Sequence, residues 1–185
     1  MNIKKTANSL LNFAIKRLAE IFGILISLTG AMLFLALITY SPNDPNFIFP
    51  ENTKIENLMG FQGSFVSDLF FQSVGLISYL VPFTLIFTGI NILNTKDFFL
   101  FIENNFFAIL YLIFGTLFFA NYYSDTYALY INGNSGFVGD YLGQTFLKSI
   151  ILINESIFFY ILILIIIILF LISINFSPRN FLMFI

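Results

Sequence analysis

The stretch FVSDLFFQSVGLISYLVPFTLIFTGINIL, residues 65–93, decides the fold of this chain. It is apolar enough to cross a bilayer, whose hydrocarbon core of about 30 Å takes roughly 20 helical residues, and we place a span near 66–93. A straight helix over the whole stretch would be about 43 Å long. We therefore expect it to tilt, bend or emerge at the membrane surface. Pro82 has no N–H group for the carbonyl of Ser78 and is expected to kink the helix there.

Three further apolar segments are long enough to span a bilayer, near 18–40, 104–123 and 150–175. The chain is 58% hydrophobic and 10% charged, whereas soluble domains are about 45–50% apolar and about 25% charged. The segments lack the alternation of barrel strands, and open backbone groups are not viable in lipid. The sequence therefore predicts an all-α membrane protein, with a four-helix transmembrane domain over 18–176. The first span is too long for a signal-peptide core and is expected to stay in place.

Lysine and arginine near the ends of the spans set the orientation of the chain, because cytoplasmic loops carry more of them. A cytoplasmic N-terminus puts six basic residues inside and two outside. The inner ones are Lys4, Lys5, Lys16, Arg17, Lys96 and Arg179, and the outer ones are Lys54 and Lys148. We predict that the basic N-terminus 1–17 and the tail 177–185 are both cytoplasmic. The outer loops are then 41–64 and 124–149.

An internal repeat is one interpretation of the pattern. FVSD at 65–68 recurs as FVGD at 137–140, each time just before an even-numbered span. Two helical hairpins of the same orientation would produce this; the alternative is two helix starts of similar chemistry. Residues 137–148 are further predicted to form a short interfacial helix before the last span. Its apolar contacts would be Phe137, Tyr141, Leu142 and Phe146.

Small residues at helical spacing predict where the helices approach each other closely in lipid. The candidate packing positions are Gly23, Ser27, Gly30 and Ala31 in the first span, Gly75 and Pro82 in the second, and Ala108 and Gly115 in the third. We interpret them as internal packing faces. An oligomer contact through the face of the first span is the alternative.

The second span also carries a polar stripe on one side, with Asp68, Gln72, Gly75, Tyr79 and Pro82 at steps of three and four. We expect Asp68 at the outer edge of the membrane, capping the helix N-terminus. A buried ionisable residue would instead indicate a functional site. A small transporter or channel that uses this stripe as a polar path is therefore an alternative function. Asp140 is a second candidate cap or polar position.

The chain lacks the residues that most chemistry needs. It contains no cysteine and no histidine, which removes disulfides, thiolate and imidazole metal ligands and the usual general base. No G-x-x-x-x-G-K-[ST] sequence is present for nucleotide phosphates. Eight basic residues and a net charge of −2 do not predict a nucleic-acid surface. We predict no catalytic, cofactor-binding or metal-binding residue, no cofactor and no enzyme activity.

Several short motifs, taken in order, resemble a known family. The first span ends in YSPNDP, residues 40–45, and GFQGS follows at 60–64. Asp68, Gly75 and the YLVP of 79–82 come next, and GFVGDYLG at 136–143 precedes the last span. From about residue 17 to residue 175 the chain resembles the N-terminal four-helix membrane domain of FtsK/SpoIIIE-type DNA translocases.

The resemblance implies an inner-membrane domain that anchors a hexameric, ATP-driven DNA pump at the division septum and recruits cell-division proteins. The partners would be the bilayer, other copies of the chain and division proteins, with DNA handled by a motor beyond the fourth helix. The chain stops at Ile185, before any linker or motor, so these residues are not expected to translocate DNA. A scaffold subunit of another membrane complex is a further alternative.

Overall fold

The computed structural model describes residues 3–45, 54–124, 133–151 and 153–176, and within them the chain forms helices and turns and no strand. The elements are α1 (Ile3–Ile38), α2 (Gly60–Val74), the 3-10 helix η1 (Gly75–Leu80), α3 (Val81–Thr95), α4 (Phe99–Tyr122), the 3-10 helix η2 (Gly133–Ser135), α5 (Gly136–Gly143), α6 (Phe146–Ile151) and α7 (Glu155–Ser173). Four helical runs are long and apolar enough to cross a membrane: Asn8–Ile38, Gly60–Thr95, Phe99–Tyr122 and Glu155–Ser173. The prediction of an all-α protein with four such helices is confirmed.

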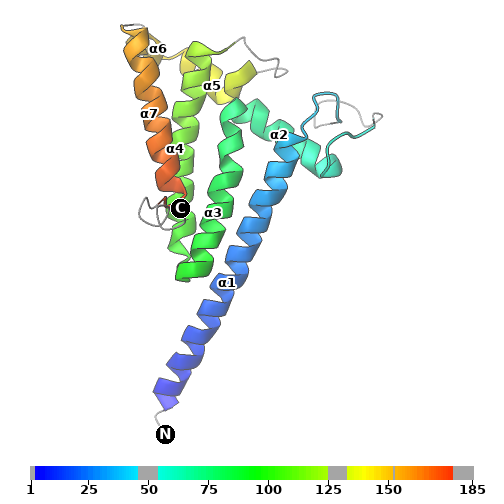
Figure 1. The fold of residues 1–185 in the computed structure, drawn as a ribbon, viewed down its shortest axis with the longest axis vertical. Helices are drawn as coiled ribbons and strands as arrows, with labels where there is room; N and C mark the ends of the chain where they lie inside the picture. Colours follow the sequence, from blue (N-terminus) through cyan, green and yellow to red (C-terminus); the bar gives the residue numbers. More distant parts are fainter. Residues whose placement is uncertain (1–2, 46–53, 125–132, 152, 177–185) are drawn as a thin grey trace, which may run out of the picture.

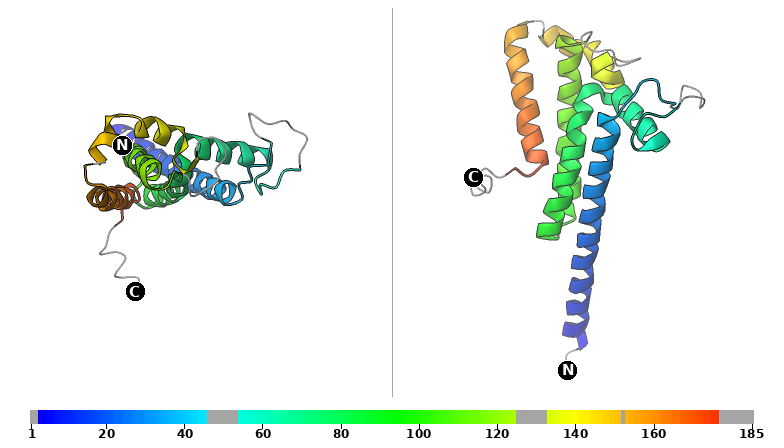
Figure 2. Two further views of the ribbon diagram at one scale, coloured as in Figure 1. Left: turned by 90° about the horizontal axis from the view of Figure 1, so that it is seen from above. Right: turned by 45° about the vertical axis from the view of Figure 1, so that its right-hand side comes forward.

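The long helices lie side by side in the order α1, α3, α4, α7 (Figure 1). Helix α1 packs on α3, α3 on α4, and α4 on α7, so α1 and α7 lie at the two ends of the row. The short helices α2, α5 and α6 lie together at one end of the bundle, while α1 continues past the other helices at the opposite end (Figures 1 and 2). Each half of the chain thus has the same order: a long helix, a connecting segment with short helices, and a second long helix. The FVSD and FVGD tetrapeptides lie in α2 and α5.

The second span is interrupted, in agreement with the expectation that a stretch of this length bends, although the bend is at Gly75 and not at Pro82. Helix α2 ends at Gly75, whose φ of 69° and ψ of −149° lie in a region that is open almost only to glycine. There the chain turns, so that α2 lies across the end of the bundle while η1 and α3 descend through it (Figure 1). Together η1 and α3 are about 34 Å long. This length still covers a hydrocarbon core.

The sequence predicted a kink at Pro82 within one continuous helix, and this prediction is wrong. Pro82 occupies the first turn of α3, directly after η1. An N–H group in the first turn of a helix has no intrahelical partner, so the missing donor of proline costs nothing there, and its fixed φ favours the start of a helix. The direction of the chain changes at Gly75 instead, and Pro82 starts the new helix.

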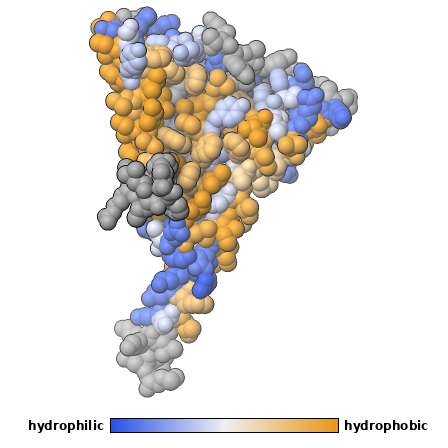
Figure 3. Space-filling view, in the orientation of Figure 1, coloured by the Kyte–Doolittle hydropathy of each residue, from blue (hydrophilic) through white to orange (hydrophobic). Residues whose placement is uncertain are grey.

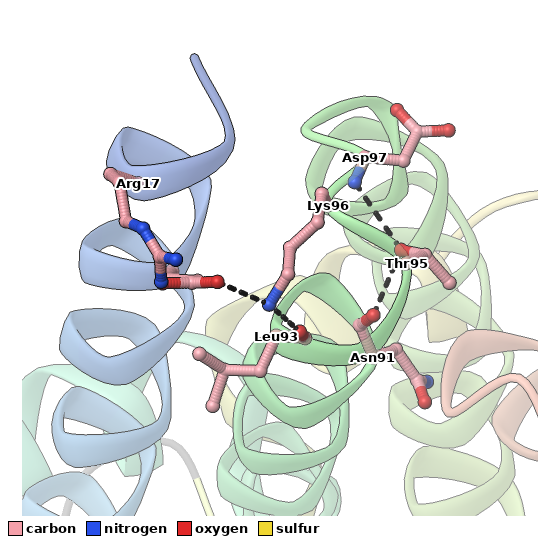
Figure 4. A network of polar contacts seen from close by, with 7 residues as sticks. Arg17, Asn91, Leu93, Thr95, Lys96 and Asp97 are labelled. Carbon is pink, nitrogen blue, oxygen red and sulfur yellow. Dashed lines mark hydrogen bonds and ion pairs between the residues drawn. The ribbon is translucent and has the colours of Figure 1, made fainter. Parts of the chain in front are cut away.

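Helix α1 begins at Ile3, well before the predicted start of the first span at residue 18, so the basic N-terminal residues continue the same helix. An ion-pair network ties its lower part to the turn after α3 (Figure 4). Glu20 pairs with Arg17 on its own helix at 2.5 Å and with Lys96 at 2.8 Å. Lys96 has a φ of 62° and caps α3, with its N–H donating to the carbonyl of Ile92 at 2.8 Å.

The surface of the bundle matches a membrane environment. Apolar residues cover α7 and the middle of the molecule, and hydrophilic residues gather at the upper rim and around the lower part of α1 (Figure 3). Helix α7 exposes Ile157, Tyr160, Leu164 and Ile168 on its outer side and packs Leu162 against α4. Its outer side is therefore suited to face lipid.

The segment before the last span forms two short helices, α5 and α6, where one helix over 137–148 was predicted. Phe137 and Tyr141 are 63% and 66% exposed, as expected for side chains that contact the membrane surface, while Leu142 packs toward the α4–α7 core. The side chain of Phe146 lies outside the described residues. Residues 144–145 separate the two helices, and the hydroxyl of Thr145 donates there to the carbonyl of Leu142.

Candidate functional site: close helix contacts and a buried polar cluster

Helices α1 and α3 approach each other through glycine. A Cβ atom added to Gly23 would lie 2.7 Å from the carbonyl oxygen of Gly89, and one added to Gly30 would lie 2.9 Å from the backbone of Ile86. Ser27 lies between them and donates its hydroxyl to the carbonyl of Ile86 at 3.2 Å. Small residues allow this backbone approach, which in lipid replaces the missing hydrophobic driving force between helices. The structure thus places Gly23, Ser27 and Gly30 on the α1–α3 contact.

Ala31 is different from its neighbours, because its side chain is exposed on α1 and does not face α3. The spacing of four from Ser27 misplaced it, since the contact follows Gly23, Ser27 and Gly30 around the helix. On α4 the predicted positions Ala108 and Gly115 are buried and face the second span. Ala108 packs with Ile77, and a Cβ atom on Gly115 would overlap the side chain of Ile77.

The turn at Gly75 is locked against the other half of the chain. A Cβ atom on Gly75 would overlap the carbonyl of Asn134 and lie 2.8 Å from the backbone nitrogen of Gly136. One on Gly136, whose φ is 64°, would lie 2.6 Å from the backbone nitrogen of Gly75. The two backbones therefore touch where α2 meets η1 and where η2 meets α5. This contact joins the two hairpins at their common end.

The YSPNDP motif holds the start of α2 against the end of α1. Both carboxylate oxygens of Asp44 accept backbone N–H groups, from Glu56 at 2.8 Å and from Asn57 at 2.9 Å. The Asn57 side chain in turn donates to the carbonyls of Ala36 and Thr39, which the end of α1 leaves without helical partners. The motif thus has a structural role that the sequence analysis did not assign to Asp44 and Asn57.

We expect Asp44→Ala to release residues 54–59 from the end of α1, because one buried and one part-buried N–H group would lose a charged acceptor. Hydrogen bonds to charged groups contribute about 1.5–3 kcal/mol, so a loss of about 2 kcal/mol is expected. The measurement is the free energy of unfolding in mixed detergent micelles, together with the rate of proteolysis in this segment. Asp97→Ala is the control, because Asp97 is exposed and accepts only from Phe99 two residues on. Equal effects of the two substitutions would contradict the role of Asp44.

Asp68 is not a helix cap, contrary to the prediction. The N-cap position of α2 is Met59, and Asp68 lies in the second half of that helix. Its side chain is only 7% exposed and accepts from the hydroxyl of Tyr40 at 3.1 Å, at the end of α1. The carboxylate therefore fastens α2 to α1 beside the Asp44 contact.

The predicted polar stripe from Asp68 to Pro82 does not form a continuous path. It required one straight helix, but the turn at Gly75 separates Asp68 and Gln72 on α2 from Tyr79 and Pro82. Gln72 is partly buried in α2, and the hydroxyl of Tyr79 reaches the carbonyl of Leu37 at 3.5 Å, a long contact. Asp68 and Tyr79 bind to the end of α1, which removes the argument for a conducting stripe. Asp140 is exposed on α5 and accepts from the hydroxyl of Ser135 at 2.7 Å.

A cluster of polar side chains is buried between α3, α4 and the end of α7, and the sequence analysis missed it. Thr84 of α3 shares hydrogen bonds with the hydroxyl of Tyr111 at 3.1 Å and with that of Ser173 at 2.9 Å. All three side chains are fully or almost fully buried. The last turn of α7 is thus joined to both neighbouring helices within the apolar bundle.

A second set of bonds continues the cluster by one turn. The side-chain nitrogen of Asn104 on α4 donates to Thr88 and to the side chain of Asn175, both at 2.8 Å. Asn91 donates to the carbonyl of Ile174 and to the side chain of Asn175, both at 3.1 Å. Asn175 has a φ of 51° and ends α7 in the left-handed conformation that asparagine tolerates. We call these seven residues, Thr84, Thr88, Asn91, Asn104, Tyr111, Ser173 and Asn175, the polar cluster.

A sequence signal for the polar cluster exists. Thr84, Thr88 and Asn91 follow one another at steps of four and three, on one face of an otherwise apolar helix. Polar side chains in a spanning helix are expected to face the bundle interior. What the sequence does not show is their partner, because Ser173 and Asn175 come more than 80 residues later and belong to the end of a nearly pure aliphatic span.

We expect Asn104→Ala to weaken the attachment of the end of α7 to α3 and α4. Hydrogen bonds between helices in membranes contribute about 0.6 kcal/mol on average and at most about 1.7, so two lost bonds should cost about 1–2 kcal/mol. Amide hydrogen exchange should rise most in residues 170–174. Asn105→Ala is a matched control, since Asn105 donates only within its own helix, to Phe101. Unchanged exchange in Asn104→Ala would contradict the role of the polar cluster.

The polar side chains described above hold helices and helix ends together. Among the described residues no group of three or more acidic residues is placed to hold a metal ion. The donors of the polar cluster bind one another or helix-end carbonyls, while the side-chain oxygen of Asn104 is buried without a hydrogen-bond partner. This arrangement fixes the order of the helices and the place where the chain leaves α7.

Comparison with known proteins gives a coherent result. The family described as "4TM region of DNA translocase FtsK/SpoIIIE" matches residues 15–183. A DNA translocase FtsK of Vibrio vulnificus is 37% identical over 83 residues, which cover 44% of this chain and 8% of that protein. A DNA translocase FtsK of Caulobacter vibrioides is 31% identical over 79 residues, covering 43% of this chain and 10% of that protein. The chain therefore matches about a tenth of the length of these relatives. No solved structure matches.

Proposed function

This chain belongs to the family of the 4TM region of FtsK/SpoIIIE DNA translocases, and from that premise we propose that it is the membrane anchor and assembly domain of such a translocase. The observation that carries the proposal is the extent of the match, which includes all four long helices from α1 to α7. The domain tethers the protein, assembles with further copies and recruits cell-division proteins at the septum. It binds no cofactor and performs no chemistry of its own.

The polar cluster supports this role. A chain that carries a cytoplasmic motor after its last span must leave the membrane at a defined place. Ser173 and Asn175, at the end of α7, are held by hydrogen bonds from α3 and α4. The bonds join the point of exit to two other spans, so that force applied to the tail is distributed over the bundle.

The orientation proposed here has both termini in the cytoplasm of a bacterial inner membrane. It rests on the excess of lysine and arginine on that side. Because the chain has no cysteine, single cysteines report on accessibility without background. A membrane-impermeant maleimide should label Lys54→Cys in intact spheroplasts and Asp97→Cys only after lysis. The opposite pattern would contradict the orientation.

Depletion of the gene in its own bacterium tests the proposed function. We expect cells that elongate without completing septa and that leave chromosomes at the closing septum. Re-expression of the intact protein should restore both division and segregation. Normal division and normal segregation after full depletion would contradict the proposal, whichever orientation the chain has.

A further inference from the structure

An apolar groove lies between α2 and the upper part of α1. Helix α2 leaves the bundle sideways at the top of α1 (Figure 1), and a cavity of about 360 Å³ lies in the angle between them. Its walls include Met32, Leu33 and Ala36 from α1 and Met59, Val66 and Phe70 from α2 and the residue before it. Among the residues that the structure describes, Thr29 and Gln62 are the polar ones that line it, and no charged residue does. A groove of this size lies at the lower end of the range of small-molecule sites, about 300–1,000 Å³.

The groove is continuous with the lipid-facing surface of α1. Leu25, Leu28, Met32 and Leu35 are exposed on the part of α1 assigned to the membrane. Met32 belongs both to this surface and to the wall of the groove. The groove therefore opens from a surface that is in contact with hydrocarbon.

Helix α2 exposes apolar side chains. Its one charged residue, Asp68, is turned inward to Tyr40, while Phe61 and Leu69 are exposed. An exposed helical side with apolar and no charged side chains is suited to the boundary between headgroups and acyl chains. Helix α2 is thus suited to lie at the boundary where the acyl chains begin, and the groove lies on the side of α2 that faces the hydrocarbon core.

We propose that this groove binds one acyl chain of a phospholipid from the leaflet in which α2 lies. The acyl chain would lie along α1 between α1 and α2, and the headgroup would lie on the opposite side of α2. Thr29, at the far end of the groove, donates its hydroxyl to the carbonyl of Leu25 at 2.9 Å. The hydroxyl proton of Thr29 is thus used within α1. The site rests on the assignment of α1 to the membrane and not on the proposed role in cell division.

The test is native mass spectrometry of the whole chain, purified in mild detergent and titrated with dioleoylphosphatidylglycerol. Thr29→Phe fills the groove from an exposed position, and Leu28→Phe is the matched control on the same helix, exposed and outside the groove. The wild type and the control should retain one phospholipid that Thr29→Phe binds at least about tenfold more weakly, a difference of about 1.4 kcal/mol. Equal retention by all three would overturn the proposal. A dimer that only Thr29→Phe loses, with lipid retention unchanged, would also overturn it and assign the groove to a second copy.

A second measurement does not depend on any substitution. The wild type is placed in vesicles that contain a phosphatidylglycerol with a photoreactive diazirine on its acyl chain. After illumination, adducts should concentrate on Met32, Met59 or Val66 relative to the exposed residues of α7. Adducts spread evenly over all lipid-facing helices would contradict a bound chain in the groove.

Discussion

Gly75→Ala should lower the free energy of unfolding by about 4 kcal/mol or more. Two costs add up at this position. An alanine in this backbone conformation is strained by about 1–3 kcal/mol. Its Cβ would in addition overlap the carbonyl of Asn134, a backbone atom that no side-chain rotation can move away. The measurement is unfolding by sodium dodecyl sulfate in mixed micelles, which gives the free energy relative to the wild type.

Gly60→Ala is the control for a positive φ without a steric contact. Gly60 has a φ of 66°, close to the 69° of Gly75, but nothing lies within 4 Å of a Cβ atom added there. The control should lose only the backbone term, about 1–2 kcal/mol. If Gly75→Ala lost no more than Gly60→Ala, the contact between the two hairpins would not contribute to the fold.

Gly89→Leu should separate α1 from α3 and cost about 3 kcal/mol, the typical upper range for overpacking. A Cβ atom at this position already overlaps the carbonyl of Gly23 and the hydroxyl of Ser27, and a leucine adds three further carbons. Glu20 and Lys96 then move apart, although they lie at a distance from the substitution. With cysteines at these two positions and none elsewhere, a short bismaleimide should link them in the wild-type background and fail in Gly89→Leu.

Ala31→Leu on α1 is the control for Gly89→Leu on α3. Ala31 is exposed on α1, so the added carbons meet lipid and the stability should change by less than about 0.5 kcal/mol. The link between positions 20 and 96 should form normally. A loss of the link in Ala31→Leu, or its persistence in Gly89→Leu, would contradict the assignment of the glycine contact.

The sequence predicted the number and type of the long helices well, because apolar length is a strong signal in a membrane protein. It placed Gly23, Ser27, Gly30 and Gly115 on faces where the structure shows close contacts. It failed at Gly75 and Pro82, where proline is the stronger local signal but the turn occurs at the glycine. The reason is tertiary: the backbone of Asn134 approaches Gly75, and nothing local to residues 65–93 indicates this.

The polar residues were harder to predict. Asp68 was placed at a helix start because a carboxylate costs little there, but its partner is Tyr40, just after the end of α1. The polar cluster depends on pairs such as Thr84 and Ser173, which are 89 residues apart. Periodicity shows that such groups face inward. It does not show which helix they meet.

The proposed anchoring and recruiting role is tested with residues 1–185 alone, fused at the C-terminus to a fluorescent protein and expressed in the native bacterium. If these residues anchor and recruit without a motor, dividing cells should show a fluorescent band at the division site. The fusion with Gly75→Ala should show an even membrane signal. An even distribution of the unchanged fusion around the whole membrane, at normal stability and expression, would contradict the central claim.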